Sequence, residues 1–287
     1  MIGQSLRQAI AAAADELADA GIDSARVDAE LLAAHAAGVD RGRLLLVDPD
    51  PAFTDRFRAL IDRRIHRIPL QHLTGEAHFG PVTLQVGPGV FIPRPETEAL
   101  LEWAMGLDLP ANPVIVDLCT GSGALALALA HVHPHAHVIA VEKSPEALVY
   151  TRRNCGVGNV EILPADVTEA GLLGDRDGAV DLVVSNPPYI PDGAQLDPEV
   201  ADHDPAQALF GGPDGMAVIE PIAALAARLL RPGGYVGIEH DDTTSEETVA
   251  ALARTGTFEN ITARRDLSGR PRFVTGARIG MQQVGES

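Results

Sequence analysis

The sequence predicts an α/β protein in which a small N-terminal helical bundle precedes a seven-stranded, Rossmann-like domain. Apolar residues recur at helical intervals up to about residue 70, which indicates packed helices. Beyond residue 113, aliphatic runs typical of buried strands alternate with helix-like segments, which favours a mostly parallel sheet. The run 114–118 leads through a turn with Gly121 and Gly123 into an alanine- and leucine-rich helix at 124–130. Strand, glycine turn and helix in this order form the first unit of a doubly wound nucleotide-binding sheet.

These patterns divide the chain into three predicted parts: a helical domain at 1–74, a linker or β-hairpin at 75–92, and the Rossmann-like domain at 93–287. In the first part, Ser24 is the predicted N-cap of a second helix. The Asp-Pro-Asp-Pro run at 48–51 separates that helix from a third. In the linker, apolar residues alternate with polar ones over 82–86, as in a strand.

The Rossmann-like domain is predicted to begin with a helix at Pro95, because proline is well suited to the first turn of a helix. A glycine-rich turn at 211–215 is expected to lead into a helix from Met216. The remaining apolar runs predict strands at 138–141, 161–165, 181–185 and 235–238, with a closing antiparallel strand at 272–279.

Composition is typical of a soluble cytoplasmic protein. The chain has 287 residues, a formal net charge of −18 and no run long and uncharged enough to span a bilayer. Acidic residues follow the alanine run 11–14 closely, so that run is not a secretory signal. Two cysteines give no disulfide framework and suit a reducing compartment. The histidines between 131 and 137 surround a proline in an expected surface loop, so we predict no metal site there.

The glycine turn points to a cationic nucleotide ligand. It lacks the G-x-G-x-x-G spacing that binds a dinucleotide pyrophosphate, and the carboxylate of Asp117 just before it would repel one. Asp117 could instead orient the loop or accept from an ammonium group, which suits S-adenosylmethionine better than NAD. The next strand ends in Glu142, where a ribose-binding acid is expected. Asp166 and Val167, after a third strand, are predicted to edge the adenine.

The tetrad Asn186-Pro187-Pro188-Tyr189 follows the aliphatic run 181–185 directly. The prolines end the strand and donate no backbone hydrogen bonds, so nearby carbonyls are free to accept from a ligand. Asn186 adds a side-chain acceptor and Tyr189 adds an aromatic face. Two acceptors beside a flat wall suit a planar NH₂ group, as in methylation of an amide or amino nitrogen.

Almost the whole sequence resembles the protein-(glutamine-N5) methyltransferases of the HemK/PrmC type, which modify the glutamine of the Gly-Gly-Gln motif in peptide-chain release factors. The segment Pro93-Arg94-Pro95-Glu96-Thr97-Glu98 is the most specific part of the likeness. The resemblance implies a Rossmann-like fold and binding of S-adenosylmethionine, with S-adenosylhomocysteine as product. The glutamine would bind at Asn186, Pro187, Pro188 and Tyr189, and the cofactor at Asp117, Cys119, Thr120, Gly121, Ser122, Gly123, Glu142, Asp166, Val167 and Asn186.

The chain departs from the family pattern at a few positions. Cys119 stands where glycine is usual, so the loop must avoid a positive φ there or be strained. Glu142 replaces the commoner aspartate, and His72 replaces an aromatic residue. Residues 238–242 lack the usual glutamate-glycine ending of that strand.

In the expected reaction, Asn186 Oδ1 and the Pro187 carbonyl accept from the two N–H groups of the glutamine amide. This orients the nitrogen towards the sulfonium methyl while Tyr189 and Pro188 enclose the amide. Two alternatives remain: an N6-adenine nucleic-acid methyltransferase, which shares the tetrad, and a non-catalytic nucleotide-binding module. The acidic charge favours a protein substrate over a nucleic acid. The enzyme is expected to be a monomer and to have no membrane partner.

Overall fold

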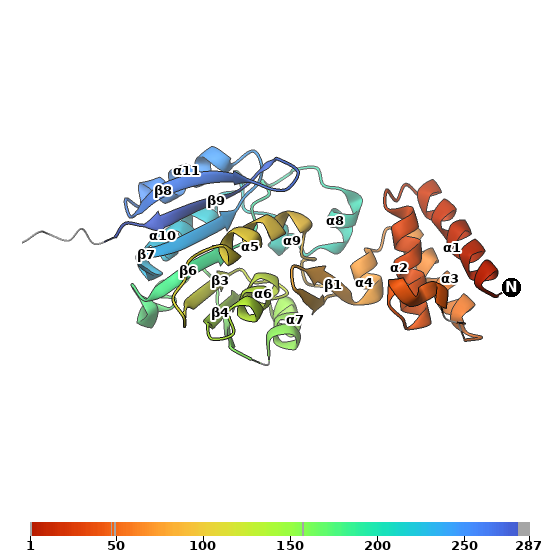
Figure 1. Cartoon of the computed structure of the whole chain (residues 1–287). Helices are drawn as coiled ribbons and strands as arrows, with labels where there is room; N and C mark the ends of the chain where they lie inside the picture. Colours follow the sequence, from red (N-terminus) through yellow and green to blue (C-terminus); the bar gives the residue numbers. More distant parts are fainter. Residues whose placement is uncertain (1, 47, 49, 157, 281–287) are drawn as a thin grey trace, which may run out of the picture. The chain divides into compact units, whose positions relative to one another are not determined.

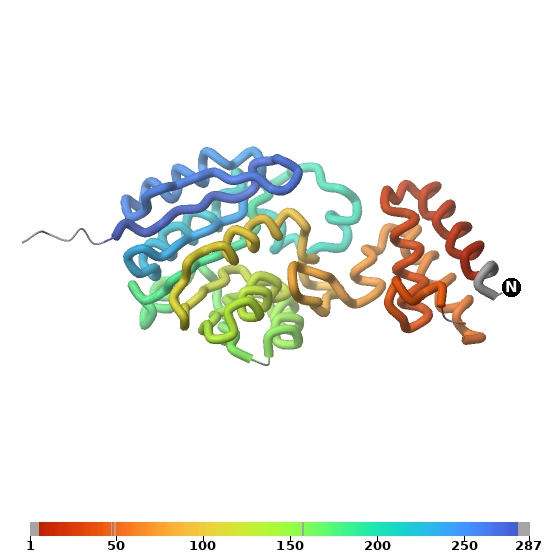
Figure 2. Tube along the Cα trace, viewed as in Figure 1, coloured from red at the N-terminus to blue at the C-terminus, as the bar shows by residue number. Residues whose placement is uncertain are grey.

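The computed structural model describes residues 2–46, 48, 50–156 and 158–280, and it separates into two compact units. Unit 1 contains residues up to Glu76 together with Leu196–His203, and unit 2 contains Ala77–Gln195 and the chain from Asp204 onward. The chain therefore leaves unit 2 shortly after the tetrad, contributes a short segment to unit 1, and returns (Figures 1 and 2).

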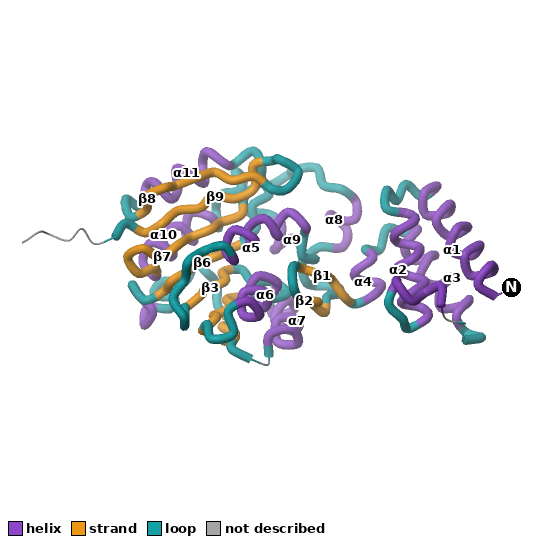
Figure 3. Tube along the Cα trace, viewed as in Figure 1, coloured by secondary structure: helices purple, strands orange, loops and turns teal. Residues whose placement is uncertain are grey.

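Unit 1 is helical, as the spacing of its apolar residues predicts (Figure 3). Its core contains fully buried Leu17, Leu32 and Ile61, one from each of the three longest helices. Ser24 does precede the second helix, but its hydroxyl donates to Asp28 Oδ1 at 2.8 Å and caps no backbone N–H. The elements are α1 (Ile2–Asp19), α2 (Ala25–Ala37), the 3₁₀ helix η1 (Arg41–Leu46), α3 (Phe53–Ile65), α4 (Leu70–Thr74) and, from the later segment, α8 (Pro198–His203).

A buried ion pair joins these helices. Arg64 of α3 donates to Asp28 of α2 at 2.7 Å, and both side chains are almost completely buried. Arg64 also pairs with Glu199 of α8 at 2.9 Å. Since a buried charge left without its partner is strongly destabilising, this pair fixes α8 in unit 1.

Unit 2 is built on a seven-stranded sheet with the order β5-β4-β3-β6-β7-β9-β8 (Figure 1). Its first five strands are parallel, β9 runs antiparallel to β7, and β8 runs antiparallel to β9. A separate hairpin, β1 (Glu76–Phe79) and β2 (Val82–Gln85), precedes it. The sheet strands are β3 (Val114–Leu118), β4 (His137–Glu142), β5 (Val160–Pro164), β6 (Val180–Ser185), β7 (Leu230–Glu239), β8 (Phe258–Arg265) and β9 (Pro271–Arg278).

Helices cover both faces of this sheet, because successive strand residues point to opposite sides. Ile115 of β3 packs into the cluster that holds α5 and α6, whereas the adjacent Val116 packs into the cluster that holds α10 and α11. The glycine-rich segment 211–215 is a turn, as predicted, although the next helix begins at Ile219 rather than at Met216. The helical elements of unit 2 are η2 (Pro95–Thr97), α5 (Glu98–Met105), α6 (Ala124–Val132), α7 (Pro145–Cys155), η3 (Gly174–Arg176), α9 (Ala206–Leu209), α10 (Ile219–Leu229) and α11 (Ser245–Arg254).

Strand β8 was not expected from the sequence. It lies at the edge of the sheet, and most of its residues are exposed, so it lacks the aliphatic run that marks the central strands. Its apolar residues are Phe258, Ile261 and Ala263, and their spacing of three and then two residues is not the strict alternation that marks a half-buried strand.

Candidate functional site

The predicted site residues gather at one edge of the sheet of unit 2. Strands β3 to β7 are parallel, so their carboxyl ends meet at the same edge. Leu118 pairs with Val141 on one side and with Ser185 on the other, and Ser185 also pairs with Ile238. The glycine turn, Glu142 and the tetrad therefore follow neighbouring strands, although they are far apart in sequence.

Asp117 holds the glycine turn through hydrogen bonds. It is 1% exposed, and its Oδ2 accepts from Thr120 Oγ1 at 2.5 Å and from Ala126 N at 3.0 Å. Its Oδ1 is buried and has no hydrogen-bond partner within the described part of the chain. Burial raises the pKa of Asp117 to about 7, against the contacts from Thr120 and Ala126, which lower it. An unsatisfied buried carboxylate oxygen is a binding position for a cationic donor.

The turn itself is left-handed at three points. Gly121 and Gly123 have φ of 58° and 87°, and Cys119 has φ of 61°. Cys119 therefore adopts a positive φ, which glycine would adopt without strain, and of the two expected possibilities the loop is strained there. Burial also raises the pKa of the Cys119 thiol above its usual range, so the thiolate that a nucleophilic role would need is disfavoured.

Glu142 closes the turn on the side of β4. Its Oε2 accepts from Gly121 N at 2.9 Å and its Oε1 accepts from Ser144 N at 2.7 Å. Each carboxylate oxygen keeps further lone-pair capacity for a diol. Asp166 accepts from the backbone and hydroxyl of Thr168, and the adjacent Val167 is buried in the core cluster that Cys119 also contacts.

The tetrad is held from two sides. Asn186 Nδ2 donates to Thr97 Oγ1 at 3.0 Å, and Tyr189 Oη donates to Glu239 Oε1 at 3.0 Å. Asn186 Oδ1 accepts no hydrogen bond among the described residues. Because Nδ2 faces Thr97, the Oδ1 that is expected to accept from the substrate amide is directed away from Thr97.

The glycine-rich turn supports the backbone of the tetrad. Gly211 N donates to Ile190 O at 2.9 Å, and Ile190 N donates to Leu209 O at the same distance. A Cβ at Gly211 would lie 2.6 Å from Pro188 O, and one at Gly215 would lie 2.3 Å from Tyr189 O. Only glycine fits at these two positions, because backbone lies against backbone.

Two residues of this site, Thr97 and Glu239, were missed as functional positions. Thr97 belongs to the specific segment 93–98 and is 3% exposed. Glu239 ends the aliphatic strand β7 and is 1% exposed, beside Arg272 of β9. A lone carboxylate at the end of a buried strand was the signal in the sequence, as it was for Glu142.

The arginine of the same segment has a structural partner. Arg94 forms an ion pair with Asp204 Oδ2, and Asp204 Oδ1 accepts from Ile92 N at 3.3 Å. The Arg94 guanidinium lies over the Phe91 ring, 5.1 Å from its centroid. These contacts hold the entry to η2, and therefore Thr97, in place.

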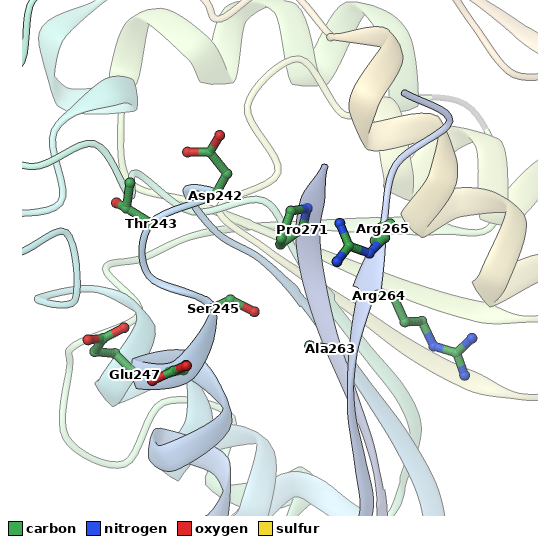
Figure 4. Close-up of a pocket in the computed structure, with 9 residues that line it drawn as sticks. Asp242, Thr243, Ser245, Glu247, Ala263, Arg264, Arg265 and Pro271 are labelled. Atoms are coloured by element: carbon green, nitrogen blue, oxygen red, sulfur yellow. The ribbon is translucent and has the colours of Figure 1, made fainter. Parts of the chain in front are cut away.

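A separate hollow lies between the start of α11 and strand β8 (Figure 4). Asp242, Glu246 and Glu247 line it together with Arg264 and Arg265. Charges of both signs face this hollow, so its chemistry selects no particular ligand.

Within the described residues, no helix is both long and apolar enough to cross a membrane.

Comparison with known proteins first defines the class. The family model "Methyltransferase small domain" matches residues 88–207, and the model "PrmC N-terminal domain" matches residues 8–75. The fold of a methyltransferase from Pyrococcus furiosus aligns with a TM-score of 0.50 and 18% identity, covering 69% of this chain and 89% of that one. The protein has the methyltransferase fold, and S-adenosylmethionine is the methyl donor that this class uses.

The relatives then define the family. Release factor glutamine methyltransferase of Mycolicibacterium smegmatis is 67% identical, covering 96% of this chain and 98% of its own. The proteins of the same name from Mycobacterium tuberculosis H37Rv and Streptomyces coelicolor are 58% and 48% identical, covering 96% and 93% of this chain and 92% and 95% of their own. The chain belongs to the release factor glutamine methyltransferase family.

Proposed function

We propose that this protein transfers a methyl group from S-adenosylmethionine to the side-chain nitrogen of the glutamine in the Gly-Gly-Gln motif of release factors. The observation that carries the proposal is the bond from Asn186 Nδ2 to Thr97. It leaves Asn186 Oδ1 as an acceptor beside the proline carbonyls, and a primary amide has two N–H groups to donate.

The residues around the glycine turn fit the methyl donor. Asp117 Oδ1 is buried and unpartnered among the described residues, which suits an ammonium group. A Cβ at Gly121 would meet nothing within 4 Å, so the turn has an open side against which a ligand fits. We assign the methionine end to Asp117 and residues 119–123, the ribose to Glu142, and the adenine to Asp166 and Val167. When bound, the donor supplies an electrophilic methyl group on a sulfonium.

The protein's own contribution is to orient and enclose the glutamine amide. Asn186 Oδ1 and Pro187 O accept hydrogen bonds from its two N–H groups, which directs the nitrogen towards the donor and stabilises the positive charge that builds up on it during attack. The methylated nitrogen then releases one proton to solvent. Pro188 and Tyr189 flank the flat amide and exclude water. Positioning of this kind supplies as much as about 7–11 kcal/mol of a reaction barrier.

The helical domain, residues 1–74, is the proposed docking site for the release factor. Leu45 and Leu46 of η1 are 48% and 82% exposed, an unusual pair of adjacent apolar side chains facing solvent. Because its substrate is a translation factor, the enzyme acts in the cytoplasm, and we propose that it does so as a monomer.

The test is transfer of radiolabel from S-adenosylmethionine to a purified release factor, beside its Gly-Gly-Gln→Gly-Gly-Ala variant. We expect label on the first and none on the second. The Asn186→Ala enzyme should lose transfer by orders of magnitude while its cofactor affinity changes little. Equal labelling of both release factors would place the modification elsewhere, and label on neither, with cofactor bound, would call for nucleic acid as the next substrate.

A further inference from the structure

The orientation of the Asn186 amide depends on which group accepts the hydroxyl proton of Thr97. Asn186 Nδ2 donates to Thr97 Oγ1, so the Thr97 oxygen is the acceptor in that bond. A hydroxyl has a single proton, and Thr97 must direct it to another group. If that proton pointed at Asn186 instead, the asparagine would have to present its oxygen to Thr97, and its NH₂ would face the substrate.

Glu239 provides an acceptor for the Thr97 proton and thereby determines which end of the Asn186 amide faces Thr97. Its Oε2 is buried and has no hydrogen-bond partner among the described residues, and the interaction with the Thr97 hydroxyl lowers the pKa of Glu239. Its Oε1 accepts from Tyr189 Oη at 3.0 Å. An ionised carboxylate only accepts hydrogen bonds, so Oε1 takes the Tyr189 proton and the unpartnered Oε2 offers an acceptor for the Thr97 proton.

We propose that Glu239 is a positioning residue for methyl transfer: as a carboxylate it draws the hydroxyl protons of Thr97 and Tyr189, and thereby holds Asn186 Oδ1 towards the methyl-accepting amide. This inference rests on the proposed function of the tetrad. It assigns a part in substrate orientation to β7 and, through Thr97, to the segment 93–98.

The charges around Glu239 make this arrangement dependent on pH. Burial raises the pKa of Glu239 to about 7, with Glu96 of η2 adding to the rise. Thr97, Tyr189 and Arg272 of β9 oppose it. A protonated Glu239 would become a donor itself and would release the Thr97 hydroxyl to turn towards Asn186. The rate should therefore increase as the pH rises through about 7.

The experiment compares kcat at saturating cofactor and release factor for wild type, Glu239→Gln, Thr97→Val and the double variant between pH 6 and 8. Glutamine has nearly the shape of glutamate, but its single side-chain oxygen cannot replace both carboxylate oxygens as acceptors for Thr97 and Tyr189. We expect each single variant to lose roughly 10–100-fold in kcat, the size of effect that a misplacement of about 1 Å produces. The double variant should lose little more than either single one, because both act through Asn186.

Three further readouts separate positioning from a purely structural role. The cofactor Kd should stay within about twofold of wild type, and the rise in rate near pH 7 should flatten in Glu239→Gln, whereas Asp117 titrates alike in both proteins. Thr97→Ser keeps the hydroxyl and should restore most of the rate that Thr97→Val loses. Glu102→Gln, at an exposed position of α5, is the matched control for loss of one carboxylate.

The outcomes distinguish the two proposals. Label transfer by wild type with an unchanged kcat and pH profile in Glu239→Gln would overturn the role of Glu239 alone. A lower melting temperature with wild-type kcat would show that Glu239 serves only the fold, and would overturn it as well. No transfer by wild type would overturn both this inference and the proposed function.

Discussion

The contact between Gly211 and the tetrad allows the site to be disturbed without changing any residue that touches substrate. A Cβ at Gly211 would lie 2.6 Å from Pro188 O, 2.8 Å from Gly215 O and 2.9 Å from Tyr189 Cα. All three are backbone atoms, so no side chain can rotate away. Gly211 does not have a positive φ, so alanine would introduce no backbone strain of its own. Gly211→Ala therefore acts on the tetrad by displacement alone.

The size of the effect follows from these distances. Non-bonded heavy atoms settle at about 3.5–4.0 Å, so the backbone at 188–189 must move by roughly 0.5–1 Å to accept the new methyl group. A misplacement of about 1 Å can reduce a rate by about 10²-fold. We expect kcat to fall by about 10–100-fold, equivalent to about 1.4–2.7 kcal/mol of barrier. Overpacking should lower the free energy of unfolding by about 1–3 kcal/mol.

The assay is methyl transfer to release factor at saturating substrates, with cofactor affinity and thermal unfolding measured on the same samples. Gly174→Ala is the matched control, because Gly174 also lacks a positive φ and a Cβ there would meet only the end of the Arg228 side chain, at 4.0 Å. We expect Gly174→Ala to behave as wild type. Equal kcat values for the two variants would refute the argument that Gly211 sets the position of the tetrad.

Three further predictions concern the cofactor turn and the helical domain. Burial raises the pKa of Asp117 to about 7 from an unfolded value near 4, so between these pH values the folded state holds a proton that the unfolded state releases. The contribution of Asp117 to the free energy of unfolding therefore falls as the pH rises from about 4 to 7. Asp117→Asn should remove that fall, so the melting temperature of the variant relative to wild type should increase between pH 5 and 8. Its cofactor Kd should rise roughly tenfold or more. A Kd unchanged in calorimetry would contradict the assignment of Asp117 to the ammonium group. Cys119→Gly should raise the free energy of unfolding by about 1 kcal/mol, because it removes a left-handed non-glycine residue, and a loss of stability in denaturant titration would speak against strain at that position. Replacing both Leu45 and Leu46 by serine should raise KM for the folded release factor but not for a short Gly-Gly-Gln peptide, and equal KM changes for both substrates would rule out docking through these side chains.

The central strands were predictable because their residues are buried on both sides. The runs at β3, β4 and β6 contain almost only aliphatic residues, which is the pattern of a parallel strand covered by helices on both faces. Strand β8 was not predictable in this way, since it lies at the edge of the sheet and exposes most of its length to solvent. The placement of α8 in unit 1 also had no local signal, because its partner Arg64 lies 135 positions before Glu199 in the numbering.

By itself, the sequence determined the α/β class, the glycine turn and the tetrad, because strand ends, left-handed turns and proline breaks are local properties of a few adjacent residues. The tertiary structure decided which distant side chains complete the site. Thr97 and Glu239 lie 89 residues before and 53 residues after Asn186, and only the order of strands in the sheet brings them to the same edge. It also decided their hydrogen-bonding roles, since donor and acceptor directions depend on burial and on partners that no local pattern specifies.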